Sequence, residues 1–136
     1  MQDRMTNMRN ERMKLLGLDP QDPASMKAII AMGARLFNAP VLIVLTMDKV
    51  LDKWSVYDMG LLSQNILLAA QNSGLGTLIA MSLVSQPDIL RAELGIPGSQ
   101  TIVIGIGLGY VDTKSLINTY VSSRRPIAET VTLKGF

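Results

Sequence analysis

One long stretch of the sequence, residues 56–73, predicts a helix that a chain of this size cannot cover alone. Ser55 and Asp58 have the S-x-x-D spacing of a helix N-cap, and Gly74 stands where a left-handed C′ residue belongs. The polar residues of the stretch recur every seven positions on one narrow stripe: Asp58, Gln64, Asn65, Gln71 and Asn72. A helix that is apolar around the rest of its circumference must be buried on more than one side. In a chain of 136 residues, we expect one of those sides to pack against a second copy, as a homodimer.

The chain contains neither cysteine nor histidine. Without cysteine it can form no disulfide, thiol nucleophile, iron–sulfur site or CxxC redox pair, and the cytoplasm is the expected compartment. Without histidine, His-containing zinc sites and Ser-His-Asp triads are excluded, and we expect no metal site. Any redox or transfer chemistry must therefore depend on a bound cofactor or on carboxylates, Lys, Arg, Ser and Tyr.

Charge and hydropathy exclude two classes of partner. Thirteen Lys and Arg residues against eleven Asp and Glu give a net charge of +2, too small and too evenly spread to indicate nucleic-acid binding. The most apolar stretches are short or interrupted by polar residues, so we expect no membrane span: 40–46, 61–70 and 101–108. The first residues carry Arg and Lys but no apolar segment follows them, unlike a secretory signal.

Capping residues, helix-ending glycines and apolar patterns predict the elements before the long helix. Methionine and leucine at helical spacing indicate a helix over 1–16 that stops at Gly17. Asp22 and Pro23 supply an N-cap and a first helical residue, so a second helix should run to about Gly33. The run 40–46 is rich in β-branched residues and predicts a strand buried on both faces.

The elements after the long helix are shorter. We expect an extended segment over 78–81, a helix that begins near Ser85 and ends at Gly95, a strand over 101–109 and a terminal strand over 130–134. Asp48 and Asp52 lie in a polar connection and are interpreted as loop and capping residues rather than as paired catalytic carboxylates. Strands separated by helices indicate a single domain, 1–136, with an α/β/α sandwich and a sheet of three or four strands.

Three glycines alternate along the strand 101–109 and therefore share one of its faces: Gly105, Gly107 and Gly109. The dinucleotide fingerprint G-x-G-x-x-G needs a third glycine where this chain has Tyr110. We therefore interpret the glycines as a place of close packing against the long apolar helix, not as a cofactor loop. Arg124 and Arg125 can be read either as a solvated pair or as a phosphate-binding pair.

From about Leu36 onward, the chain resembles the C-terminal part of the nitroreductase family of FMN-dependent oxidoreductases. Six segments carry the resemblance in the same order as in that family: 37–44, 58–70, 74–77, 91–97, 107–110 and 125–129. Residues 1–35 form a helical segment before the region 36–136 that resembles the family. The resemblance implies an α+β sandwich that dimerises through long apolar helices, with FMN in the dimer interface.

The resemblance also implies positions for the cofactor. Ile79, Ala80, Met81 and Ser82 would run beside the isoalloxazine ring, with a backbone N–H near Met81 facing flavin N5. Arg124, with Arg125 as its neighbour, would meet the FMN phosphate. Because the flavin carries the chemistry, no side chain is expected to be catalytic.

Members of this family begin with an Arg-rich segment, which is followed by helices and a strand. Residues 1–4 of this chain do not match the Arg-rich segment, and the helices and the strand have no counterpart either. We therefore expect a domain that lacks its N-terminal part. The function implied is transfer of a hydride from NAD(P)H through FMN to a small-molecule acceptor, a nitroaromatic, a quinone or a similar compound. The alternative is a family member that acts as a dimeric structural or interaction module without tight FMN binding.

Overall fold

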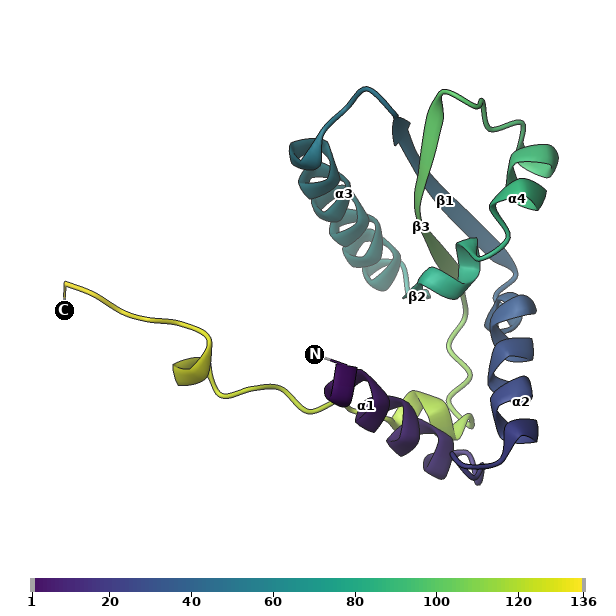
Figure 1. The fold of residues 1–136 in the computed structure, drawn as a ribbon, viewed down its shortest axis with the longest axis vertical. Coiled ribbons are helices and arrows are strands. Elements are labelled where there is room, and N and C mark those ends of the chain that lie inside the picture. The colour runs from purple at the N-terminus through teal and green to yellow at the C-terminus, as the bar shows by residue number, and fades with distance from the viewer. Residues whose placement is uncertain (1, 136) are drawn as a thin grey trace.

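A small antiparallel sheet forms the centre of the fold (Figure 1). The computed structural model describes residues 2–135, with side chains from Arg4 onward. Its strands are β1 (Val41–Asp48), β2 (Gly76–Ala80) and β3 (Gln100–Gly109), in the order β1-β3-β2. Four α-helices and four short 3₁₀ helices complete the described part of the chain: α1 (Gln2–Leu15), α2 (Pro23–Ala34), α3 (Lys53–Asn72), α4 (Pro87–Leu94), η1 (Leu36–Asn38), η2 (Met81–Val84), η3 (Leu116–Thr119) and η4 (Ile127–Glu129).

Helices lie on both sides of the sheet, which confirms the expected α+β sandwich. Figure 1 shows α3 beside one face, with η2 and α4 on the other side. The central strand β3 carries the best-buried side chain of the sheet, Ile106, which is 0% exposed. Below the sheet in Figure 1, α2 descends from the start of β1, and α1 lies to the left of the lower end of α2. None of the helices described here has the length and hydropathy needed to cross a bilayer.

The long helix α3 begins earlier than the sequence predicts. Its N-cap is Asp52, whose carboxylate accepts a hydrogen bond of 3.0 Å from the backbone N–H of Trp54, so Ser55 lies inside the helix. Aspartate caps at least as well as serine and adds a favourable charge at the positive end of the helix dipole. At the other end the prediction is confirmed, because Gly74 follows the helix with φ +73°.

Local signals predict the boundaries of the other helices well. Gly17 adopts φ +70° after α1, and Asp22 caps α2 by accepting from the N–H of Ala24 at 2.9 Å. The helix α4 ends at Gly95 with φ +63°, as expected, but it begins at Pro87 with Gln86 as its N-cap. The predicted cap, Ser85, instead donates its hydroxyl to the carbonyl of Ser82 at 2.8 Å.

The strand β1 occupies an edge of the sheet, so the prediction that it is buried on both faces was wrong. Only Leu45 is buried in it, at 8% exposed, and Val41 is 46% exposed. The physical reason is its place in the sheet, because α3 packs on β2 and β3 and leaves the side of β1 less covered.

The alternating glycines do mark close packing, but their partner differs from the predicted one. A Cβ on Gly105 would lie 2.6 Å from the Cβ of Leu83 in η2, and one on Gly109 would lie 2.6 Å from the Cδ of Pro40. The glycine face therefore meets η2 and the start of β1, whereas α3 lies beside the opposite face of the sheet (Figure 1). Without these glycines η2 could not approach the central strand.

The predicted terminal strand over 130–134 was also wrong. The described residues after η4 have no regular structure, and Figure 1 shows this tail projecting away from the body of the molecule. Two contacts with α1 direct the chain away from the sheet: Arg4 donates to the carbonyl of Ser123 at 3.0 Å, and the Tyr120 hydroxyl donates to Glu11 at 2.7 Å. A sequence with strand propensity forms no strand unless it reaches the edge of a sheet.

Candidate functional site

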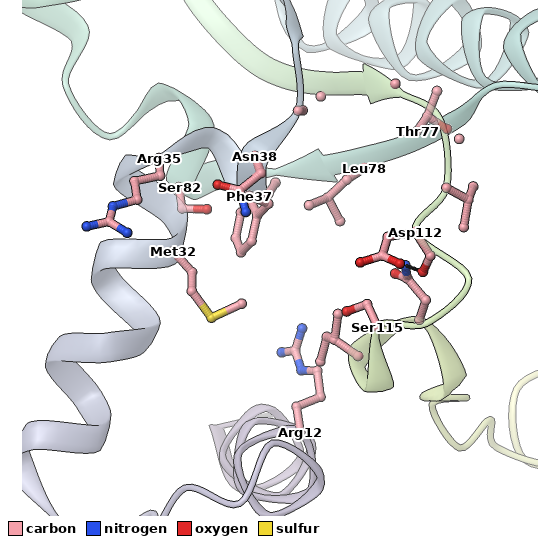
Figure 2. Close-up of a pocket in the computed structure, with 18 of the residues that line it drawn as sticks. Arg12, Met32, Arg35, Phe37, Asn38, Thr77, Leu78, Ser82, Asp112 and Ser115 are labelled. Carbon is pink, nitrogen blue, oxygen red and sulfur yellow. Dashed lines mark hydrogen bonds between the residues drawn. The ribbon is translucent and has the colours of Figure 1, made fainter.

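A cavity of about 1000 Å³ opens where the sheet ends (Figure 2). Its walls come from α1, α2, η1, β2, the end of β3 and the segment that follows β3. Ligand pockets commonly measure roughly 300–1,000 Å³, so the space is large enough for a cofactor or substrate.

Three of the four residues expected beside a flavin ring line the cavity. Ile79, Ala80 and Ser82 line it, whereas Met81 does not and is 80% exposed. The side chain of Ser82 is also pressed against α2, because a Cβ on the buried Gly33 would lie 3.0 Å from the Cβ of Ser82. The end of β2 is thus fixed at the cavity wall by close packing with the end of α2.

Backbone donors are concentrated at the same point. The strand β2 is an edge strand, and its pairing with β3 ends at Ala80 opposite Gly105. Ala80 is the N-cap of η2, so Met81 and Ser82 begin a helix. The first N–H groups of a helix have no partner inside it and are available to an acceptor from outside. A flavin ring nitrogen or carbonyl is an acceptor of this kind, so this wall fits the ring of FMN.

Arg124 and Arg125 do not reach the cavity within one chain. Neither residue lines it, and both are exposed on the tail. The Nη1 of Arg124 donates to the backbone carbonyls of Ser122 at 3.1 Å and Ser123 at 3.4 Å, and it also contacts the Ser122 hydroxyl. The structure of one chain therefore does not bring the two predicted parts of the cofactor site together.

Three other arginines line the cavity, and the sequence analysis did not single them out: Arg9, Arg12 and Arg35. The Nε of Arg9 is buried and lacks a hydrogen-bond partner among the described residues. Arg12 donates its Nε to the carbonyl of Met8 at 3.3 Å, and its guanidinium lies 6.0 Å from the centre of the Tyr120 ring. The i, i+3 spacing of Arg9 and Arg12 is the one signal that could have placed them on a common helix face.

A second missed feature is the backbone of η1. Leu36, Phe37 and Asn38 have φ values of +54°, +52° and +60°, so three consecutive residues other than glycine are left-handed. Such conformations cost free energy and persist only where the surrounding structure imposes them. The turn directs Phe37 into the cavity, as Figure 2 shows. Asn38 is a residue type that tolerates the left-handed region, but Leu36 and Phe37 carry no such signal.

The segment after β3 closes the cavity on the side of α1. Tyr120 lines the cavity and holds this segment to α1 through its hydrogen bond to Glu11. That hydrogen bond is the largest cause that raises the pKa of Tyr120 above its ordinary value. Desolvation and the charge of Glu11 raise this pKa further, and the charges of Arg12 and Arg124 oppose the rise. The bond is therefore intact at neutral pH and is lost when the phenol ionises.

Among the described residues, no cluster of three Asp or Glu side chains is placed to hold a metal ion. The walls of the cavity consist of apolar side chains, Ser82 at the start of η2 and arginines from α1 and the end of α2.

Comparison with known proteins shows the family of this chain. Residues 31–110 match the sequence profile of the Nitroreductase family. The chain is 32% identical over 129 residues to the nitrobenzene nitroreductase of Ectopseudomonas oleovorans, covering 95% of this chain and 57% of that protein. It is 38% identical over 98 residues to the chloronitrobenzene nitroreductase of Comamonas testosteroni, covering 72% of this chain and 43% of that protein.

The fold is also that of a solved structure, the FMN and NADPH-dependent nitroreductase NfnB from a Sphigopyxis strain, HMH. The TM-score is 0.93 at 24% sequence identity, over 99% of this chain and 60% of that one. The chain thus spans about half the length of the two curated relatives and somewhat more of the solved structure.

Proposed function

Because this chain belongs to the nitroreductase family, we propose that it is an FMN-dependent oxidoreductase that uses NAD(P)H to reduce a nitroaromatic, a quinone or a similar acceptor. The observation that carries the proposal is that Ile79, Ala80 and Ser82, at the end of β2 and the start of η2, line one cavity of the chain. When bound, FMN would supply the hydride chemistry, which no side chain of this protein can perform.

The chain's own residues then bind and orient the ring. The N–H groups of Met81 and Ser82 are proposed to donate to the N5 edge of the flavin, and Ile79 and Ala80 to cover the ring and exclude water from it. Donors that are fixed by the end of a strand and the start of a helix need no reorganisation when charge develops on the ring, so they stabilise this charge efficiently. Residues 1–35 and 36–136 are proposed to act as one unit, because α1 and α2 complete the cavity.

We further propose that the protein functions as a homodimer through α3. The inner stripe of this helix is narrow, and its buried residues are the small Ser63 and Ala70. Large apolar side chains remain exposed around the rest of the helix: Trp54, Val56, Tyr57, Leu61, Leu62 and Leu68. An apolar surface of this extent is typical of an interface. Assembly would also give Arg124 and Arg125 a phosphate to meet, which one chain alone does not.

A second candidate is a dimeric structural or interaction module without tight FMN binding. It is favoured by one observation: neither Arg124 nor Arg125 lines the cavity of its own chain. The two candidates differ in flavin content, so absorbance in the flavin region of the purified protein separates them. For either candidate, we propose the cytoplasm as the compartment.

The test of the enzyme function removes one backbone donor. Proline has no N–H, is tolerated at the first helical position and requires an extended residue before it. Met81 is that first position of η2, and Ala80 before it has φ −151° and ψ 137°, so Met81→Pro fits the fold. Met81→Ala is the matched control, because it removes the same side chain and keeps the N–H.

We expect Met81→Pro to lower the rate of flavin reduction by NAD(P)H by about 10²-fold, as for the loss of one preorganised donor. Met81→Ala should retain the rate within a few-fold. Equal rates in the two variants would show that the N–H of Met81 has no role at the flavin. A parent protein that binds no FMN would instead favour the second candidate.

A further inference from the structure

The contact between α2 and η2 depends on a glycine. Gly33 is buried near the end of α2, and a Cβ added to it would lie 3.0 Å from the Cβ of Ser82 and 3.3 Å from its Oγ. Real Cβ atoms rarely have contacts this short, so Ser82 would have to move by a few tenths of an ångström. The missing side chain of Gly33 therefore allows Ser82 to stand where it does.

The conformation of the helix does not explain this glycine. Gly33 lies within α2 and lacks the positive φ that favours glycine elsewhere in the chain. Alanine is more favourable than glycine inside a helix, so the glycine weakens α2 locally. The close approach of Ser82 is the feature of this position that requires the absence of a Cβ.

Ser82 stands between two cavities. It lines the large cavity together with Ile79 and Ala80, and it also lines a second cavity of about 260 Å³ between the end of α2, η2 and α4. Gly33 lines the second cavity and not the large one. Because there is space on both sides of Ser82, a Cβ on Gly33 should displace this residue without overpacking a closed core.

The neighbours of Ser82 are held by other contacts. The strand β2 pairs with β3 as far as Ala80, opposite Gly105, and Leu83 is only 3% exposed. Figure 2 shows Ser82 beside Phe37 at the end of α2, and the same added Cβ would lie 3.9 Å from the Cζ of Phe37, an ordinary contact. A methyl group on Gly33 would therefore press on Ser82 and leave Phe37 in place.

From this geometry, we propose that Gly33 is a positioning residue, which sets the depth at which Ser82 stands in the wall of the large cavity. Gly33 does not line that cavity, so it acts through Ser82. The consequence for FMN rests on the proposed function, which places the isoalloxazine ring beside residues 79–82. A displaced Ser82 changes the space left for the ring, and with it the affinity for FMN and the surroundings of the ring.

The test adds one methyl group and then removes its partner atoms. Gly33→Ala introduces the Cβ. Its combination with Ser82→Gly removes both atoms that this Cβ would meet, whereas its combination with Ser82→Ala keeps the nearer one, the Cβ at 3.0 Å. Both combinations lack the hydroxyl, so they differ in the contact itself. Ser82→Gly and Ser82→Ala alone provide the two reference backgrounds.

FMN affinity is measured by fluorescence titration, the surroundings of the ring by the absorbance spectrum of bound FMN, and the wall itself by the backbone amide NMR signals of Ile79 and Ala80 in FMN-free protein. We expect Gly33→Ala to weaken FMN binding about tenfold, or about 1.4 kcal/mol, as for a mildly overpacked contact, and to shift the absorbance bands and the amide signals. The same substitution should act fully in the Ser82→Ala background and have no effect in the Ser82→Gly background.

Gly60→Ala is the matched control, because it adds the same methyl group to a helix at a position where the Cβ meets open space. It should leave FMN affinity, the absorbance spectrum and the amide signals as in the parent. A cooperative thermal transition in every variant shows that the fold is retained.

The proposal is overturned if Gly33→Ala has no effect, or if it acts equally in the Ser82→Gly and Ser82→Ala backgrounds. Either result with FMN still bound leaves the proposed function intact. FMN affinity and absorbance that stay constant while the amide signals shift would also overturn it, because Gly33 would then position a wall that the flavin does not meet.

A parent protein that binds no FMN would refute the proposed function instead. The amide signals of the FMN-free protein then decide the role of Gly33. A shift that depends on the Cβ of Ser82 supports the positioning of the wall, and the absence of a shift overturns it.

Discussion

Substitution of Leu68 on the outer face of α3 should dissociate the proposed homodimer. Leu68 is 58% exposed, and Leu61, one heptad earlier on the same face of the helix, is 51% exposed. The neighbouring Leu67 is half-buried within the chain, so its substitution would disturb the fold as well. Leu68 therefore tests association more cleanly.

The magnitude follows from the exposed fraction of the side chain. Full burial of a leucine stabilises by about 1.5–3 kcal/mol, so the exposed half of Leu68 is worth about 1 kcal/mol in an interface. In a two-fold symmetric dimer each substitution counts twice, so Leu68→Ala should cost about 2 kcal/mol, or roughly 30-fold in Kd. Leu68→Asp adds a carboxylate that must be desolvated on both protomers, which should leave a monomer.

Sedimentation velocity at micromolar concentration is the assay. The parent should sediment as a dimer, Leu68→Ala as a mixture that depends on concentration, and Leu68→Asp as a monomer. Leu94→Asp is the control, because Leu94 is 56% exposed but lies on α4, on the other side of the sheet (Figure 1). A monomeric parent, or a Leu68→Asp protein that remains dimeric, would refute the reasoning.

Three further substitutions test other parts of the structure. Gly105→Ala should lower the free energy of unfolding, measured by chemical denaturation, by about 1–3 kcal/mol, because its Cβ would lie 2.6 Å from that of Leu83. The control is Gly60→Ala on α3, where the added Cβ meets open space, and it should be neutral or stabilising. Arg124→Ala should weaken FMN and leave riboflavin unchanged in a fluorescence titration if Arg124 meets the phosphate; equal losses would point to misfolding. Tyr120→Phe should destabilise the protein at neutral pH and match the parent at high pH. The protonated phenol of the parent contributes stability at pH values below its ordinary pKa of about 10, and this contribution is lost as the pH rises through the raised pKa.

Helix ends are the part of this fold that the sequence predicted best. Gly17, Gly74 and Gly95 all follow helices with positive φ, and Asp22 caps α2 as expected. These signals are local, because a cap or a left-handed glycine satisfies backbone groups a few residues away. The early start of α3 at Asp52 is the same kind of signal, and it prevailed over the neighbouring Ser55.

The position of each strand in the sheet could not be predicted in the same way. Apolar runs located β1 and β3 to within two residues, but hydrophobicity does not say which strand is central. The sequence of 130–134 has strand propensity but forms no strand, because this part of the tail projects away from the sheet (Figure 1). Strand formation depends on an available edge, which is a property of the whole fold.

The candidate site likewise contains residues that the sequence analysis named and residues that it missed. The resemblance placed Ile79, Ala80, Met81 and Ser82 beside the flavin ring. All but Met81 line the cavity, and a role at the flavin stays a prediction for these residues. Arg12 and Phe37 were missed, because they come from different elements and meet only through the packing of α1 and α2 around the end of the sheet.

The sequence by itself thus determined the helices, the two apolar strands, the absence of cysteine and histidine chemistry and an excess of apolar surface on one helix. Only the tertiary structure decided that β1 is an edge strand, that the glycine face meets η2 and that apolar side chains and arginines line one cavity. The physical reason is the sequence separation over which the interactions act. Caps, turns and periodicity act over a few residues of chain, whereas a cavity wall and a left-handed turn such as η1 are imposed by neighbours that are distant in the sequence.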